Sequence, residues 1–218
     1  SSDLGMIVSS GALALIGRVC DWVYRHVDRI VVLSPGFRLL LIERGVPEGK
    51  IDIIYNWSDE NSLKVSDGVL PEGFPEETAF KIVFAGNMGK AQDLDVVLDA
   101  AALLKKENSR VVFVLVGGGV EVSRLKNKVE KMYLSNVIFL PPVPMVQVGK
   151  ILLAADALLV HLKKDPLFTI TIPSKTQAYM CVGKPLVMAV DGDAADLVKR
   201  SNGGVIANSG NASQLAYA

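Results

Sequence analysis

Residues 168–189 read FTITIPSKTQAYMCVGKPLVMA, and this stretch decides the expected fold. A strand end, a polar loop, a helix that opens near Pro173 and the turn Gly183-Lys184-Pro185 lead into a second apolar strand. This order places the loop and the helix N-terminus at the carboxyl end of a parallel sheet, where open α/β sheets bind their ligands. Because a helix N-terminus presents free N–H groups and the positive end of its dipole, the loop suits an anion such as a phosphate.

The rest of the chain alternates helical and strand patterns in the same way. The spacing of apolar residues predicts strands over 29–33, 50–55, 80–85, 110–116, 137–140, 157–161, 185–189 and 204–207. It predicts helices over 10–27, 36–44, 93–107, 120–132, 145–154, 173–181 and 194–201. Such alternation is typical of α/β proteins, so we expect a doubly wound, Rossmann-like parallel sheet with helices on both faces.

A polar segment divides the chain into two parts. Residues 60–78 contain the breakers Gly68, Pro71, Gly73 and Pro75 and show no periodicity, which indicates a linker. We therefore predict a remnant of one Rossmann-like domain over 1–59, a linker over 60–78 and a larger domain over 79–218. The chain opens in a helix with no preceding strand and closes in what reads as the start of a helix, so we expect it to be part of a longer protein.

The composition is that of an ordinary soluble globular protein. The chain has 218 residues, of which 50% are hydrophobic and 21% charged, and 23 basic residues balance 23 acidic ones. No basic excess points to nucleic acid. Cys20 and Cys181 lie far apart among apolar neighbours, so we expect buried free thiols and a reducing, cytoplasmic setting. Charges interrupt the apolar residues 4–33, which therefore predict neither a membrane span nor a signal peptide.

Two glycine-rich loops complete the pattern. Gly86-Asn87-Met88-Gly89 follows the strand at 80–85, and Gly117-Gly118-Gly119 follows the strand at 110–116. Together with residues 173–185 they resemble the nucleotide-sugar half of GT-B glycosyltransferases, in particular the large retaining family 4. Residues 28–34 and 53–57 resemble the last βαβ unit of the acceptor domain of that family, so the resemblance covers nearly the whole chain.

The resemblance implies a retaining glycosyltransferase of the hexosyltransferase type. Its donor would be a nucleotide sugar, with UDP favoured over GDP, and its acceptor a polysaccharide or a lipid-linked glycan of the bacterial cell surface. The family needs no metal or other cofactor. The full-length protein would work in the cytoplasm, with peripheral association at the inner face of the membrane, and this chain alone would be inactive.

The resemblance also assigns roles to residues. Lys175 and Thr169 are the catalytic candidates: the ammonium would neutralise the leaving diphosphate, and Thr169 stands where the family often has a glutamate that faces the sugar. Gln177 stands where the family has a second glutamate, and its amide could still pair with ribose hydroxyls. The donor-binding candidates are Gly86, Asn87, Gly89, Lys90, Gly117, Gly119, Val143, Ile170, Ser174, Gln177 and Gly192.

Each motif also has a purely structural interpretation. The two glycine loops can be ordinary βα turns, and Val122 stands where a dinucleotide fingerprint needs its third glycine, so an NAD site does not fit. Residues 141–144, Pro-Pro-Val-Pro, either hold the nucleobase edge or form a rigid connector. Ser174 can serve as an N-cap alone. His161 has no partner at ligand spacing, which favours a structural role.

Asp191-Gly192-Asp193 imitates the D-x-D motif of metal-dependent glycosyltransferases. It lies in a loop before a helix, within a pattern whose family works without metal, so we expect no metal site there. Gly192 would instead allow a close backbone approach to the donor sugar.

Two other functions remain open at this point. Thr169 and Gln177 in place of two carboxylates would also suit a non-catalytic nucleotide-binding or regulatory module with the GT-B half-fold. A GT-B nucleotide-sugar epimerase would need acidic and basic catalytic groups that the sequence does not show. Turnover by the full-length protein separates enzyme from module.

Overall fold

The computed structural model describes residues 10–59, 63, 70–76, 78–107 and 109–218. They form two compact units, Ser1–Tyr55 and Asn56–Ala218. The predicted boundaries at 59 and 79 remain a prediction, because most of the expected linker lies outside the described residues. Within that linker, Leu70 and Phe74 are described, and both pack against a core of the second unit.

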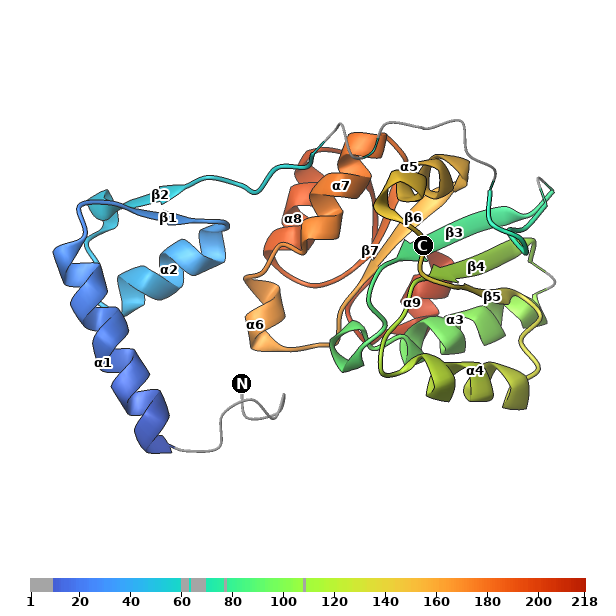
Figure 1. Cartoon of the computed structure of the whole chain (residues 1–218), viewed down its shortest axis with the longest axis horizontal. Coiled ribbons are helices and arrows are strands. Elements are labelled where there is room, and N and C mark those ends of the chain that lie inside the picture. The colour runs from blue at the N-terminus through green and yellow to red at the C-terminus, as the bar shows by residue number, and fades with distance from the viewer. Residues whose placement is uncertain (1–9, 60–62, 64–69, 77, 108) are drawn as a thin grey trace. The chain divides into compact units, whose positions relative to one another are not determined.

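The first unit is small (Figure 1). It contains α1 (Ser10–His26), β1 (Ile30–Val32), α2 (Pro35–Glu43), the 3-10 turn η2 (Glu48–Lys50) and β2 (Ile51–Ile53), with β1 and β2 paired in parallel. The Ser34-Pro35 pair begins α2: the Phe37 amide donates to the N-cap oxygen Ser34 Oγ at 3.3 Å, and Pro35 occupies the first helical position.

In the described part of the chain, the second unit builds a six-stranded parallel sheet in the order β5-β4-β3-β6-β7-β8. Its strands are β3 (Phe80–Ala85), β4 (Val111–Val116), β5 (Val137–Leu140), β6 (Ala157–His161), β7 (Leu186–Ala189) and β8 (Gly204–Ile206). Its helices are η3 (Lys90–Gln92), α3 (Asp95–Lys106), α4 (Val122–Lys131), α5 (Met145–Ala154), α6 (Pro166–Thr169), α7 (Ser174–Val182), α8 (Asp193–Arg200) and α9 (Ala212–Tyr217). The predicted doubly wound α/β fold is confirmed.

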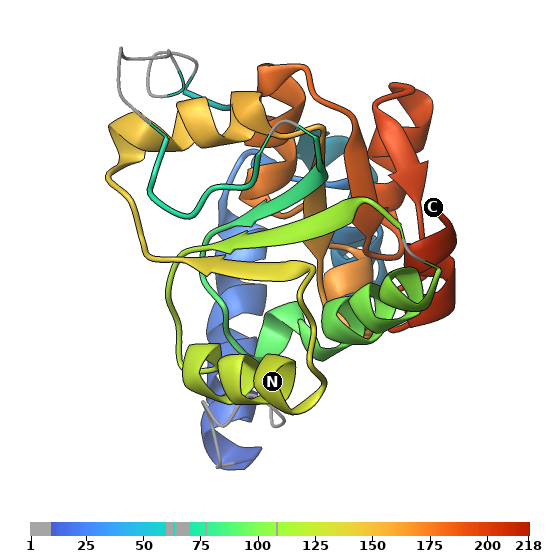
Figure 2. The same cartoon turned by 90° about the vertical axis from the view of Figure 1, so that its right-hand side faces the viewer.

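Helices cover both faces of this sheet (Figure 2). Successive strand residues point to opposite faces, so Phe84 packs with α3, α4 and α9, whereas Val83 packs with α5, α7 and α8. Parallel strands buried on both faces carry continuous apolar runs, which explains the sequence VVFVLV in β4.

The strand order reverses between β3 and β6. β3 pairs with β4 along its whole length, but it pairs with β6 only at Ile82 and Val83. The carboxyl ends of β3 and β6 therefore diverge, and this is the topological switch point at which open α/β sheets hold their ligands.

Two details of the sequence-based expectation are wrong. Phe168 and Thr169 belong to the short helix α6, which Asp165 caps by accepting from the Leu167 amide at 2.9 Å, and not to the strand end with which the expected pattern opened. Cys181 is exposed and Cys20 is partly exposed, so neither is a buried thiol. The apolar neighbours of Cys181 misled the prediction, because α7 buries Thr176 and Tyr179 on its other side.

A charged cluster joins α3 to α4. Asp95 accepts hydrogen bonds from Arg124, and its Oδ1 lies 2.9 Å from Lys128 Nζ. The hydrogen bond from Arg124, helped by Lys128, lowers the pKa of Asp95 to about 2. A carboxylate whose pKa is depressed by folding adds stability above its unfolded pKa, and this is lost as the pH falls from about 4 through about 2.

We expect Asp95→Asn to lower the free energy of unfolding at pH 7 by about 0.5–1 kcal/mol, because the group is partly exposed and screened by solvent. The difference between parent and variant should shrink as the pH falls from 5 to 2 in denaturant titrations. A difference that stays constant over that range would show that Asp95 acts through packing and not through its charge.

Candidate functional site

The predicted loops lie together at the carboxyl ends of the strands in the second unit's sheet. Residues 86–89 follow β3, 117–119 follow β4, 141–144 follow β5, 162–173 follow β6 and 190–192 follow β7. Because the strands are parallel, all five loops emerge on the same side.

The two glycine loops pack backbone against backbone. A Cβ on Gly117, whose φ is +135°, would lie 2.1 Å from the Gly86 oxygen, and a Cβ on Gly119 would lie 2.4 Å from the Met88 oxygen. The Met88 amide donates to the Gly118 oxygen at 2.7 Å. Loop packing thus accounts for Gly117 and Gly119, while Gly86 and Asn87 remain exposed at the edge where a ligand would lie.

Lys175 reaches from the start of α7 to the switch point. Its Nζ lies 3.6 Å from the centroid of the Phe84 ring, and a Cβ on Gly86 would lie 3.3 Å from the same nitrogen. Phe84 belongs to the core on the opposite face from α7, so the lysine side chain spans the gap between the diverging strands.

The Lys175 ammonium is unusual in its surroundings. Within the described residues it contacts the ring face of Phe84 and has neither a hydrogen bond nor an ion pair. Burial lowers its pKa from 10.5 to about 8. A largely buried cation without an anionic partner is costly, and the ring face compensates only in part.

This cost leads to a prediction for the ligand-free protein. Lys175→Met should raise the free energy of unfolding at pH 7 by about 1–3 kcal/mol, because it removes a charge that folding desolvates. The unfolded chain holds this proton up to a pH near 10.5 and the folded chain only to about 8, so the parent gains stability between these values. Denaturant titrations at pH 7 and pH 10 should therefore show the advantage of the variant shrinking. An equal advantage at both values would contradict the assignment.

Two of the candidate side chains are engaged within their own helices. Thr169 Oγ1 donates to the Pro166 oxygen at 2.7 Å. The amide nitrogen of Gln177, in the orientation that satisfies both of its polar atoms, donates to the oxygens of Pro173 (3.0 Å) and Ser174 (3.1 Å). Each side chain would have to give up these bonds, or offer its remaining lone pairs, to contact a sugar.

The structure also bears on the expectations for Ser174 and Gly192. Ser174 is the first residue of α7 and Pro173 its N-cap, with no side-chain capping bond, so the alternative interpretation of Ser174 as a simple N-cap is wrong. Gly192 has a φ of +79°, and a Cβ there would lie 2.0 Å from the Thr169 oxygen. The close backbone approach at Gly192 is thus made to Thr169 within the protein, and Ile170 follows directly.

Hydrogen bonds through Gln92 hold the loop that carries Gly89 and Lys90. The Gly89 amide donates to Gln92 Oε1 at 3.0 Å, and His161 Nδ1 donates to the Gln92 oxygen at 2.7 Å. Burial lowers the pKa of His161. His161 thus supports the loop, in line with its expected structural role, and Lys90 is exposed.

The proline segment 141–144 lies against the glycine loop at 117–119. Val143 packs partly buried against the core on the α7 face, and a Cβ on Gly118 would lie 3.3 Å from Pro142. The structure therefore brings the candidates at 86–90, 117–119 and 143 to adjoining loops.

Asp191 has a structural partner, because its Oδ1 accepts from the Ser209 amide at 3.0 Å. Among the residues that the structure describes, no three His, Cys, Asp or Glu side chains are grouped as metal ligands. Nor does any described helix have the length and apolar character needed to cross a membrane.

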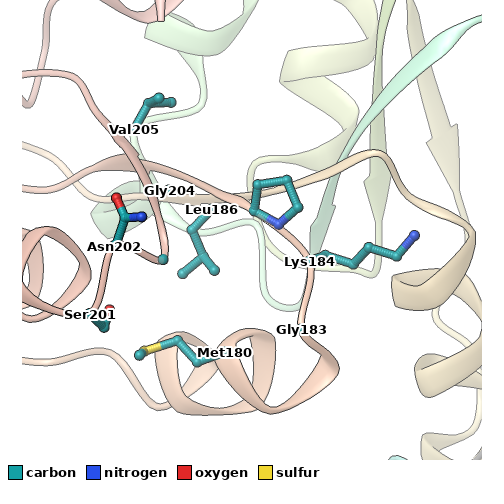
Figure 3. Close-up of a pocket in the computed structure, with 10 residues that line it drawn as sticks. Met180, Gly183, Lys184, Leu186, Ser201, Asn202, Gly204 and Val205 are labelled. Carbon is teal, nitrogen blue, oxygen red and sulfur yellow. The ribbon is translucent and has the colours of Figure 1, made fainter.

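A hollow of about 540 Å³ lies elsewhere, at the amino ends of β7 and β8 (Figure 3). Met180, Lys184 and Asn202 line it, at the edge of the sheet opposite to the candidate loops. Sequence reasoning missed Phe84 and Tyr179, the two aromatic residues that contact Lys175 and the Ala85 backbone, respectively, at the switch point. Lys175 and Phe84 are 91 residues apart in sequence, and Tyr179 and Ala85 are 94 residues apart, so no local pattern reveals these contacts.

The chain is similar in sequence to known glycosyltransferases. The sequence profile of the family "Glycosyl transferases group 1" matches residues 71–218. The chain is 26% identical over 183 residues to a Pseudomonas aeruginosa protein named "Probable glycosyltransferase WbjE", covering 83% of this chain and 45% of that protein. It is also 26% identical over 172 residues to an Escherichia coli protein named "Putative colanic acid biosynthesis glycosyl transferase WcaI", covering 76% of this chain and 41% of that protein. The chain spans less than half the length of these relatives.

Solved structures share the fold. The Anabaena protein HepE in complex with UDP and glucose superposes with a TM-score of 0.74 at 20% identity, covering 96% of this chain and 56% of HepE. HepE in complex with UDP-glucose gives a TM-score of 0.72 at 21% identity, with coverage of 92% and 56%. The family match extends over most of the chain and contains every candidate loop. The chain therefore belongs to the group 1 glycosyltransferases, which have the GT-B fold.

Proposed function

We propose that the second unit binds the nucleotide-sugar donor of a retaining hexosyltransferase, with the donor diphosphate against Lys175. The donor would be a UDP-sugar and the acceptor a growing polysaccharide or a lipid-linked glycan. The observation that carries the proposal is the Lys175 ammonium, which is held at the switch point beside Gly86 without an anionic partner in the described residues.

The proposed transfer reaction uses the Lys175 ammonium to stabilise the leaving diphosphate. In transfer, the bond between the anomeric carbon and the diphosphate oxygen breaks with its electron pair leaving on the diphosphate, the acceptor hydroxyl oxygen bonds to that carbon, and the hydroxyl proton passes to the departing diphosphate or to water. Negative charge grows on the departing UDP, and a preorganised cation in a site of low dielectric stabilises this charge. The residue after β3 that remains exposed beside Gly86, Asn87, could contribute a backbone hydrogen bond to the same diphosphate, and we propose that the step proceeds without a metal.

The comparisons support a UDP donor by likeness. Structures of HepE with UDP and with UDP-glucose share the fold of this chain. The names of WbjE and WcaI support a glycosyltransferase, and that of WcaI a role in polysaccharide synthesis. A lipid-linked acceptor and peripheral attachment of the full-length protein to a membrane belong to the same proposal.

A second candidate function is a nucleotide-binding module without catalysis. It is favoured by the bonds of Thr169 Oγ1 and the Gln177 amide within their own helices, which leave fewer polar groups for the sugar. Such a module would bind UDP and a UDP-sugar equally well and would transfer nothing in its full-length form.

Calorimetric titration with UDP, GDP, uridine and UDP-glucose tests the proposal. We expect the 218-residue chain to bind UDP more tightly than uridine and GDP, and to transfer no sugar alone. The full-length protein should release UDP from a UDP-sugar when acceptor is present. Absence of binding to any nucleoside diphosphate at millimolar concentration would refute the donor site, and binding without turnover by the full-length protein would favour the module.

A further inference from the structure

Tyr179 is buried at the switch point and bonds to the backbone of β3. Its hydroxyl accepts from the Ala85 amide at 2.9 Å and donates to the Ala85 oxygen at 3.1 Å. The side chain is 2% exposed. One phenol therefore satisfies both backbone groups of a residue 94 positions away in sequence.

The need for this bond comes from the divergence of the strands. In β3, the Phe80 and Gly86 amides point to β4, so those of Lys81, Val83 and Ala85 point to the other side. β6 pairs with β3 only as far as Val83, which leaves the amide and oxygen of Ala85 without a strand partner. Buried backbone groups of this kind are costly unless they are paired. The Tyr179 hydroxyl occupies the place that β6 has left.

Tyr179 and Lys175 lie on the same face of α7, because residues four apart in a helix are neighbours. The hydroxyl of Tyr179 bonds to Ala85, while the Lys175 ammonium lies beside the next residue, Gly86, and over the preceding one, Phe84. One helix face thus meets three successive residues of the β3 end.

We propose that Tyr179 is a positioning residue, whose hydroxyl locks α7 to Ala85 and so fixes the Lys175 ammonium beside Gly86, where the donor diphosphate binds. The inference rests on the proposed donor site for its purpose, but the lock itself can be tested without a ligand. Tyr179→Phe removes only the hydroxyl and keeps the ring that packs in the core.

The first test follows the titration of Lys175 by NMR of the protein labelled at the lysine ε-carbons, with the signal assigned by its loss in Lys175→Met. In the parent the midpoint should lie near 8. In Tyr179→Phe it should move toward 10.5 by about one unit or more, because a loosened α7 lets water reach the ammonium. The matched control is Tyr133→Phe. Because Tyr133 is 82% exposed, this substitution should leave the Lys175 midpoint unchanged. An unchanged Lys175 midpoint in a folded Tyr179→Phe protein would overturn the proposal and leave Tyr179 a packing residue.

The second test is a double-mutant cycle on the preference for UDP over uridine. Tyr179→Phe alone should reduce that preference about threefold to tenfold, because the ammonium is no longer held where it meets the diphosphate. In the Lys175→Met background the same change should reduce it by less than about twofold, since the ammonium through which Tyr179 acts is gone. Equal losses in both backgrounds would contradict the proposal.

Failure of the donor site and failure of the lock are distinguishable. If the parent binds no UDP, the proposed function fails while the Lys175 titration still tests the lock. If Tyr179→Phe does not fold, the parent alone is informative: the Ala85 amide signal should titrate with the midpoint of Lys175. An Ala85 signal that does not change through that pH range would overturn the coupling.

Discussion

Lys175→Met is expected to weaken UDP binding by roughly tenfold to a hundredfold, and uridine binding by less than twofold. A hydrogen bond to a charged group contributes about 1.5–3 kcal/mol, and each 1.4 kcal/mol is a factor of ten in affinity. Uridine lacks the diphosphate, so it does not report the ammonium. Calorimetric titration of parent and variant with both ligands measures the difference.

The matched control is Lys184→Met. Lys184 lies just beyond α7, at the opposite edge of the sheet from the candidate loops, and should affect neither ligand. The parent should also lose UDP affinity as the pH rises above that at which the bound ammonium loses its proton, whereas Lys175→Met should show no such loss. Equal losses for UDP and uridine in Lys175→Met would move the diphosphate away from Lys175.

Gly117→Ala is expected to lower the free energy of unfolding by about 3 kcal/mol or more, the range of severe backbone and packing defects. At the φ of +135° a side chain is already strained, and the new Cβ would lie 2.1 Å from the Gly86 oxygen. Gly86 cannot move away easily, because its amide is bonded to the Val116 oxygen at 2.9 Å. The displaced residue is the one beside Lys175, so UDP affinity should fall as well.

Gly210→Ala separates strain from collision. Gly210 also has a positive φ, of +75°, but a Cβ there would meet nothing within 4 Å. It should cost about 1 kcal/mol, in the range of a non-glycine residue held in the left-handed region. Denaturant titration of the two variants gives the comparison. Similar losses in both would show that the contact between the glycine loops yields easily.

The sequence predicts the second unit well because each βα repeat is a local signal. Apolar runs gave the strands at 80–85, 137–140 and 157–161 with their observed bounds. The parallel arrangement then placed the loops at one edge without further information. The same locality explains α6: a four-residue helix that depends on its Asp165 cap has too few residues for a periodic pattern.

The site was harder to predict, because side-chain partners far apart in sequence decide it. The motif at 173–185 indicated Lys175, but nothing local shows that its ammonium meets Phe84 or that Tyr179 bonds to Ala85. Nor could the pattern show that Gln177 turns back to the first turn of its own helix. The glycine loops illustrate the same limit, since Gly117 serves a contact with Gly86 that depends on how β3 and β4 pair.

The pKa of Lys175 with and without UDP tests the central claim most directly. An adjacent diphosphate favours the charged ammonium, so bound UDP should raise the pKa of Lys175 from about 8 by one unit or more, and saturating uridine should leave it unchanged. The lysine ε-carbon signal that is lost in Lys175→Met reports both values. A Lys175 pKa that stays near 8 in the UDP-saturated protein would contradict the placement of the diphosphate at this ammonium.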